Sequence, residues 1–140
     1  MDKIDMAGHL IRRLNQQSTQ VFQSQVQAAG FDITSVQFAA LDTIAQEPGI
    51  DQARLAATIS FDRATMGGVI DRLESKGLVQ RRVSPQDRRA RLLDLTPEGH
   101  RLLSECRPLV EALQADILAP LSAQEKLTFL ALAQKALRLV

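Results

Sequence analysis

The most constraining feature of the chain is a change of hydrophobic period at Gly77. Before it, apolar residues recur every three or four positions, which is typical of amphipathic helices. After it, Leu78 to Val83 and Arg91 to Leu95 each read as a short strand. The segment between them, Ser-Pro-Gln-Asp-Arg-Arg-Ala, is rich in turn formers. The sequence therefore predicts a hairpin with a basic tip.

Six helices are expected around this hairpin, and most have a recognisable start or stop. The first runs from Ile4 to about Ala29 and ends at Gly30, and the second begins with a Thr34–Gln37 capping box and ends before Pro48. The third is a short helix capped by Asp51, and the fourth, capped by Asp62 after a tight Ser60-Phe61 connection, runs to Lys76. The fifth extends from Thr96 to Pro120 with a kink at Pro108, and the last is capped by Ser122. This order predicts a mainly α (α+β) fold: a winged helix-turn-helix flanked by long N- and C-terminal helices.

Composition limits the class of protein. With 140 residues, 45% of them hydrophobic, the chain is long enough for one packed domain and too apolar for disorder. It contains no apolar run long enough for a membrane span and no secretory signal, so we expect a cytoplasmic protein, associated with the nucleoid when bound to DNA. His9, His100 and Cys106 match no zinc spacing, so no metal or cofactor is expected. Nothing resembles a catalytic motif, which argues against an enzyme.

The net charge of +1 conceals an uneven distribution. Residues 63–91 carry eight basic and three acidic side chains, which makes this segment +5 and the remainder −4. Seven of the eight basic residues are arginines, whose planar forks suit phosphates and guanine edges. The segment indicates a polyanionic partner, although a solvated charged face gives the same pattern. A winged helix that only binds another protein is a third reading, but it needs no such concentration of arginine.

The fourth expected helix would be the recognition helix, whose first turns face base edges in the major groove. Its apolar stripe comprises Met66, Val69, Ile70 and Leu73. The positions left facing outward are Arg63, Ala64, Thr65, Gly67, Gly68 and Arg72. Each glycine costs about 1 kcal/mol relative to alanine inside a helix. Either close approach to DNA or tight contact with a neighbouring helix can explain them.

The tip of the expected hairpin is too narrow to be core. Arg88 and Arg89 can reach the minor groove, where arginine favours narrow A·T tracts. The carboxylate of Asp87 can orient a neighbouring guanidinium. Arg82, on the first strand, completes the predicted DNA-binding set.

Three segments together resemble the MarR family of winged-helix regulators: residues 72–79 (RLESKGLV), 87–89 (DRR) and 93–99 (LDLTPEG). The resemblance extends over the whole chain and implies one MarR-type domain, residues 1–140. It also implies a homodimer that binds palindromic operator DNA, with residues 34–96 as the DNA-binding lobe and residues 1–30 and 97–140 as dimerisation helices. Arg89 would then be the minor-groove arginine, Asp87 its partner and Arg88 an extra phosphate contact.

A narrower resemblance points to a small-molecule effector. Residues 8–13 (GHLIRR), 33–41 (ITSVQFAAL) and 61–67 (FDRATMG) look like the branch of nicotinate-catabolism repressors, which are released by an aromatic carboxylate. His9, Arg12 and Arg13 share one helical face and can converge on a carboxylate, with Phe38 as an apolar wall. The same cations could instead solvate a helix end or contact phosphates.

Cys106 suggests an alternative, a redox-responsive regulator. A reactive thiol needs nearby cations or a helix N-terminus, which lower its pKa. Cys106 instead falls on the apolar stripe of the fifth expected helix, so we expect an inert cysteine buried at the dimer surface.

Overall fold

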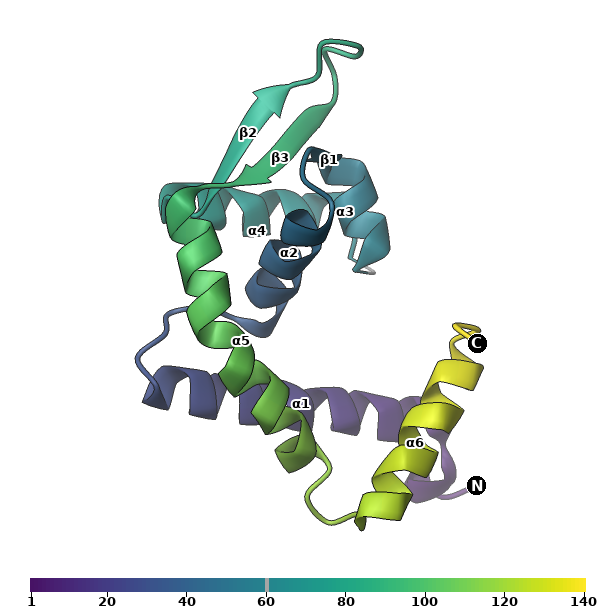
Figure 1. The fold of residues 1–140 in the computed structure, drawn as a ribbon. Coiled ribbons are helices and arrows are strands. Elements are labelled where there is room, and N and C mark those ends of the chain that lie inside the picture. Colours follow the sequence, from purple (N-terminus) through teal and green to yellow (C-terminus); the bar gives the residue numbers. More distant parts are fainter. Residues whose placement is uncertain (60) are drawn as a thin grey trace.

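The computed structural model describes residues 1–59 and 61–140, and its elements follow the expected order (Figure 1). They are the 3-10 helix η1 (Lys3–Asp5), α1 (Ala7–Ala28), α2 (Ser35–Gln46), β1 (Ile50–Asp51), α3 (Gln52–Thr58), α4 (Arg63–Ser75), β2 (Val79–Val83), β3 (Arg91–Leu95), α5 (Pro97–Ile117) and α6 (Ala123–Ala136). The predicted fold class, a mainly helical winged helix-turn-helix, is confirmed. The expected Ser60-Phe61 connection lies partly outside the described residues.

Local capping chemistry sets most helix starts. The predicted N-caps Thr34, Asp51, Asp62, Thr96 and Ser122 all accept a hydrogen bond from a backbone N–H of the following turn. The first helix is the exception, because it begins at Ala7 rather than Ile4. The preceding residues form η1, in which the Asp2 side chain accepts from the backbone N–H of Lys3.

The hairpin forms as predicted and carries one further strand. β2 and β3 pair antiparallel, with Val79 opposite Leu95 and Val83 opposite Arg91. β1 pairs with the other edge of β3 and makes a three-stranded sheet of order β1-β3-β2. Periodicity could not predict β1, because two residues are too few to show an alternation.

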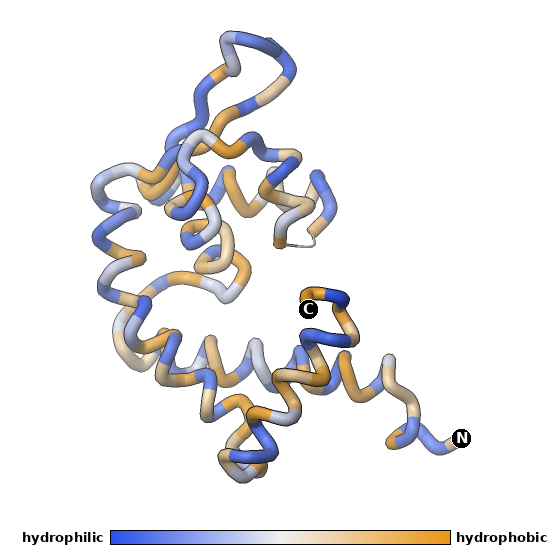
Figure 2. Tube along the Cα trace, turned by 45° about the vertical axis from the view of Figure 1, so that its right-hand side comes forward, coloured by the Kyte–Doolittle hydropathy of each residue, from blue (hydrophilic) through white to orange (hydrophobic). Residues whose placement is uncertain are grey.

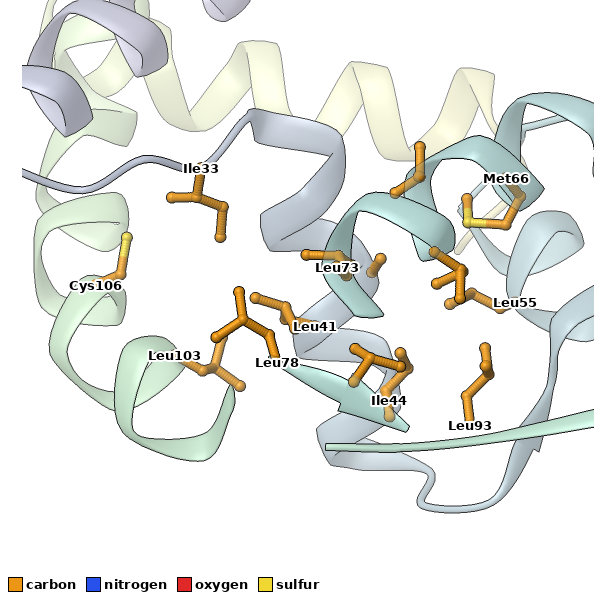
Figure 3. Close-up of a cluster of buried hydrophobic side chains, with 14 of the residues drawn as sticks. Ile33, Leu41, Ile44, Leu55, Met66, Leu73, Leu78, Leu93, Leu103 and Cys106 are labelled. Carbon is orange, nitrogen blue, oxygen red and sulfur yellow. The ribbon is translucent and has the colours of Figure 1, made fainter. Parts of the chain in front are cut away.

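The core lies mainly within the winged lobe, defined here as residues 34–96, and continues to the two long helices α1 and α5. The predicted stripe of α4, from Met66 to Leu73, is fully buried, and Leu41 and Ile44 of α2 pack with it (Figure 3). α5 contributes Leu103 and Cys106 to the same cluster. In contrast, α6, which is described in full, contains no buried residue.

α1 and α6 lie at the end of the molecule opposite the hairpin, and α5 connects the two ends (Figure 1). α5 descends from the winged lobe to cross α1, and its axis changes direction midway (Figures 1 and 2). Pro108 lies within this helix and removes the hydrogen bond to the carbonyl of Ser104, which accounts for a bend there. Among the described residues, no helix is long and apolar enough to cross a membrane.

Candidate DNA-binding surface

The start of α4 is held by Asp62 and leaves its first turn exposed. The carboxylate of Asp62 accepts from the backbone N–H of Thr65 at 2.7 Å and from its hydroxyl at 2.8 Å. These hydrogen bonds lower the pKa of Asp62, the backbone one contributing most. Arg63 and Ala64 are exposed beside them. Because the Thr65 hydroxyl donates to Asp62, it can meet DNA only as an acceptor.

Packing within the protomer does not require the two central glycines of α4. A Cβ built on Gly67 would lie 3.5 Å from Gln52 Nε2, and one on Gly68 would lie 3.6 Å from Arg72 Nη1. Both distances are ordinary van der Waals contacts with flexible side chains. Of the two explanations given above, tight contact with a neighbouring helix therefore has no support within one protomer. Close approach to DNA stays a prediction.

The hairpin tip is organised by Asp87. Its Oδ1 accepts from the backbone N–H of Arg89 at 3.0 Å and lies 3.6 Å from Arg89 Nε. The tip is tied to its base by Ser84, a buried residue whose hydroxyl accepts from the backbone N–H of Asp87. The side chain of Arg89 is 94% exposed, and Arg88 beside it is exposed as well. Asp87 therefore shapes the turn while the guanidinium of Arg89 extends into solvent.

Two arginines of β2 form ion pairs within the lobe. Arg81 pairs with Asp71 of α4 and donates to the Gly67 carbonyl at 3.4 Å, and its side chain is only 23% exposed. It fastens the base of the hairpin to α4. Arg82 donates from Nε to Asp94 of β3 at 3.0 Å. A DNA phosphate must therefore compete with a carboxylate for Arg82, whereas Arg72, at the last turn of α4, is exposed.

A cleft of about 660 Å³ separates the hairpin from the starts of α3 and α4. Its lining residues are Asp51, Gln52, Ala53, Arg63, Arg81, Asp87, Arg89, Ala90 and Arg91. The four arginines and two aspartates leave a net positive charge, which suits a phosphate backbone. Sequence reasoning proposed Arg63, Asp87 and Arg89 but missed Gln52, Ala53 and Arg91. The only available signal was that α3 must begin beside α4 in a helix-turn-helix.

The predicted effector residues belong to two helices, with His9, Arg12 and Arg13 on α1 and Phe38 on α2. His9 is half-buried and Arg12 and Arg13 are exposed in the first turns of the helix. Phe38 packs instead against Phe22, with ring centroids 6.2 Å apart. Phe22 follows Arg13 by nine residues, which corresponds to about 14 Å along a helix. The structure thus groups His9, Arg12 and Arg13 at the start of α1, whereas Phe38 of α2 contacts the far part of that helix at Phe22.

Cys106 belongs to the interior of the protomer. It is 0% exposed in a single chain and faces the same cluster as Ile33 and Leu103 (Figure 3). Burial raises the pKa of its thiol, and the neighbouring Arg107 pairs with Asp42 of α2. The prediction that Cys106 lies at the dimer surface is therefore wrong, because α5 directs this side chain into the core of one protomer. The redox alternative has no support from this environment.

Comparisons with known proteins agree with this geometry. Residues 33–90 match the model of the MarR family. Transcriptional regulator HosA of Escherichia coli O111:H- is 34% identical over 129 residues, covering 92% of this chain and 93% of the relative. The HTH-type transcriptional repressor NicR of Pseudomonas putida is 33% identical over 134 residues, covering 96% and 84%.

Solved structures show the same fold. The PcaV transcriptional regulator of Streptomyces coelicolor, in complex with its natural ligand, has a TM-score of 0.86 at 33% identity and covers 99% of this chain and 96% of that one. A mutant of E. coli MarR complexed with operator DNA has a TM-score of 0.84 at 32% identity, covering 96% and 95%. Bordetella bronchiseptica BpsR, described with regulation of its DNA binding by 6-hydroxynicotinic acid, has a TM-score of 0.83 at 29% identity, covering 92% and 96%.

Two findings support one assignment: the winged lobe has exposed arginines on both sides of one cleft, and the chain is similar to transcriptional regulators over nearly its whole length. The chain belongs to the MarR family of transcriptional regulators and is not an enzyme.

Proposed function

We propose that the protein is a homodimeric repressor that binds an inverted-repeat operator and is released from it by a small aromatic carboxylate. One observation carries this proposal. Most exposed arginines belong to the winged lobe, whereas most large exposed apolar side chains belong to α6, the residues after it and the N-terminal residues. Hydrophilic residues predominate at the hairpin tip (Figure 2). Such a protomer suits DNA at one end and a second copy of itself at the other.

The apolar end supports the homodimer. A groove of about 1080 Å³ lies between α1, α5 and α6, and its lining is mostly apolar, with Ile11, Leu130 and Leu137 among its residues. Contiguous exposed apolar surface of this kind marks an interaction site. A second copy can cover the same groove symmetrically in both protomers. In this proposal, residues 1–30 and 97–140 form the dimerisation helices.

The basic end supports operator binding by residues 34–96. The first turn of α4 enters the major groove with Arg63, and the hairpin places Arg89 at the minor groove, positioned by Asp87. The proposed DNA-binding residues are Arg63, Ala64, Thr65, Gly67, Gly68, Arg72, Arg82, Asp87, Arg88 and Arg89. Two such lobes related by a two-fold axis would reach half-sites about one DNA turn apart, roughly 34–36 Å.

The effector proposal rests on two arginines and a histidine of α1 and on two similar proteins. Arg12 and Arg13 offer positive charge and hydrogen-bond donors to a carboxylate, His9 offers a further hydrogen-bond donor, and Phe38 offers an apolar surface. NicR by its name and BpsR by its regulation by 6-hydroxynicotinic acid favour a nicotinic acid derivative. The ligand would act by binding one separation of the two lobes better than the other.

The experiment that tests the proposal is selection from a randomised double-stranded DNA library. We expect the retained sequences to share an inverted repeat with half-site centres about 10 base pairs apart. Aromatic carboxylates, with nicotinic and 6-hydroxynicotinic acid among them, are then added to the complex formed with the selected sequence. Retained sequences without a shared repeat would contradict the DNA part, and a complex that no carboxylate releases would contradict the effector part.

A further inference from the structure

The chain crosses between its long helices and the winged lobe at two points, and both meet one corner of the fold. It enters the lobe through the incoming linker, residues 29–34 between α1 and α2. It leaves through Thr96, the single residue between β3 and α5. Both crossings contact the segment Lys76–Leu78, which joins α4 to β2 and is called here the α4–β2 corner.

The incoming linker is held at this corner by the side chain of Lys76. Its Nζ donates to the carbonyl oxygen of Asp32 at 2.7 Å and to Oε1 of Gln37 at 3.3 Å, and it lies 3.6 Å from Asp32 Oδ2. Gln37 is only 5% exposed, and the same Oε1 accepts from the backbone N–H of Thr34 at 3.2 Å. The three donors of the ammonium group thus face three oxygen atoms of the linker and of α2.

The rest of the linker is fixed on both sides of Asp32. On the α1 side, the N–H of Gly30 donates to the Gln27 carbonyl at 2.9 Å and that of Phe31 to the Val26 carbonyl at 3.1 Å, which closes the end of the helix. On the lobe side, Ile33 is buried in the core. Asp32 lies between these two fixed points, and its contacts to the corner are made by Lys76.

The outgoing crossing is fixed by backbone packing instead. The N–H of Thr96 donates to the Leu78 carbonyl at 3.0 Å, and its hydroxyl donates to the Gly77 carbonyl at 2.6 Å. A Cβ built on Gly99 would collide with that Leu78 oxygen, so α5 packs directly on the corner. Of the two crossings, the incoming one is attached to the corner through the flexible side chain of Lys76.

We propose that Lys76 is a positioning residue for operator binding: it holds the incoming linker on the α4–β2 corner and so fixes the angle between α4 and α1. This inference rests on the proposed function, binding of a homodimer to an inverted repeat. In such a dimer, the angle in each protomer sets the distance between the two α4 helices. Lys76 therefore determines which half-site spacing the protein accepts, without contacting DNA bases itself.

The test measures affinity against half-site spacing. Operators with the selected half-sites moved by −1, 0, +1 and +2 base pairs are compared, each step changing the separation by about 3.4 Å and the rotation by about 35°. We expect the wild type to prefer one spacing by at least about tenfold. Lys76→Met should bind the preferred spacing about tenfold more weakly and discriminate by less than about threefold.

Two control variants separate position from charge. Lys76→Arg should restore the discrimination, because a guanidinium can donate to the Asp32 carbonyl and to Gln37. Arg101→Met removes the same charge from an exposed site on α5 and should keep the wild-type spacing profile. All variants are assayed below the lowest melting temperature seen by circular dichroism, and Lys76→Gln replaces the methionine variant if that one does not fold.

The outcomes are distinct. An affinity that falls by the same factor at every spacing would make Lys76 a phosphate contact or a stability residue and overturn the inference. Loss of discrimination in Lys76→Arg equal to that in Lys76→Met would also overturn it. A wild-type protein that selects no inverted repeat would instead contradict the proposed function on which the inference rests.

Discussion

The winged lobe and the helices at the opposite end, α6 and the start of α1, differ in how far their apolar residues are buried. In the lobe, the whole apolar stripe of α4 is buried within one chain. In α6 no residue is buried, although it is described in full and carries leucines at helical spacing. α1 belongs to both regions, since Phe22 is buried near its end whereas Ile11 is 64% exposed near its start. Within one chain, the apolar residues of the lobe are largely buried, whereas those of α6 stay exposed.

The largest effect is expected where α5 packs against the winged lobe, at Gly99. In Gly99→Ala the new methyl group would collide with the Leu78 backbone oxygen, which cannot move without shifting α5 or β2. We expect a loss of about 2–4 kcal/mol in the free energy of unfolding. Chemical denaturation measures it. Gly8→Ala is the matched control, because its Cβ would meet only Arg12 at 3.7 Å and should leave stability unchanged or higher.

At the other end, Leu130→Asp should affect the apolar groove and leave the winged lobe unchanged. A carboxylate in the groove of α1, α5 and α6 would disfavour association and leave the lobe folded. We expect monomers in sedimentation experiments and operator affinity at least about a hundredfold lower, since each lobe would then bind alone. Thr128→Asp puts the same charge on the opposite side of α6 and should leave the dimer intact. A dimer that survives Leu130→Asp would show that the groove is not the interface.

Arg89→Ala tests the basic end without touching the apolar one. Operator affinity should fall at least about tenfold, because Arg89 is proposed to enter the minor groove. The oligomeric state and the melting temperature should not change, because the side chain is almost wholly exposed. The neighbouring Arg88→Ala, as a phosphate contact alone, should cost less and reduce the salt dependence of binding. Equal affinities of Arg89→Ala and wild type would remove the hairpin tip from the DNA-binding surface.

The smallest effect is expected at Gly67, where a substitution to alanine should change stability and operator affinity in opposite directions. Gly67→Ala has room for its methyl group 3.5 Å from Gln52, so the free protein should gain up to about 1 kcal/mol of stability. Operator affinity should nevertheless fall if the helix backbone approaches DNA at this glycine. Parallel melting and binding curves decide it, and a variant that is stabilised and binds as well as wild type would leave Gly67 without a role in recognition.

The parts of this fold that could be predicted from sequence are those decided locally. The caps at Asp51 and Asp62 follow from side chains that bond within one turn, and the hairpin follows from period and turn residues. Tertiary partners could not be predicted. The pairing of Arg82 with Asp94 and the seat of Gly99 on Leu78 depend on where distant segments meet.

The candidate site divides in the same way. Exposed positions such as Arg63 and Arg89 could be predicted because subtracting an apolar stripe or finding a hairpin tip identifies them. Arg81 looked equally basic in sequence, but its charge is used internally on Asp71. Gln52 was missed because its contribution to the cleft depends on how α3 packs beside α4.

The burial of Cys106 has a practical consequence. The chain contains one cysteine, so a thiol reagent can modify each protomer once. Because that thiol faces the core between α5 and the lobe, modification requires the two to part transiently. The rate of labelling would then count those openings, and a bound operator or effector that tightens the junction would slow it. The labelling rate of Cys106 in the native protein would therefore report how often α5 and the winged lobe separate.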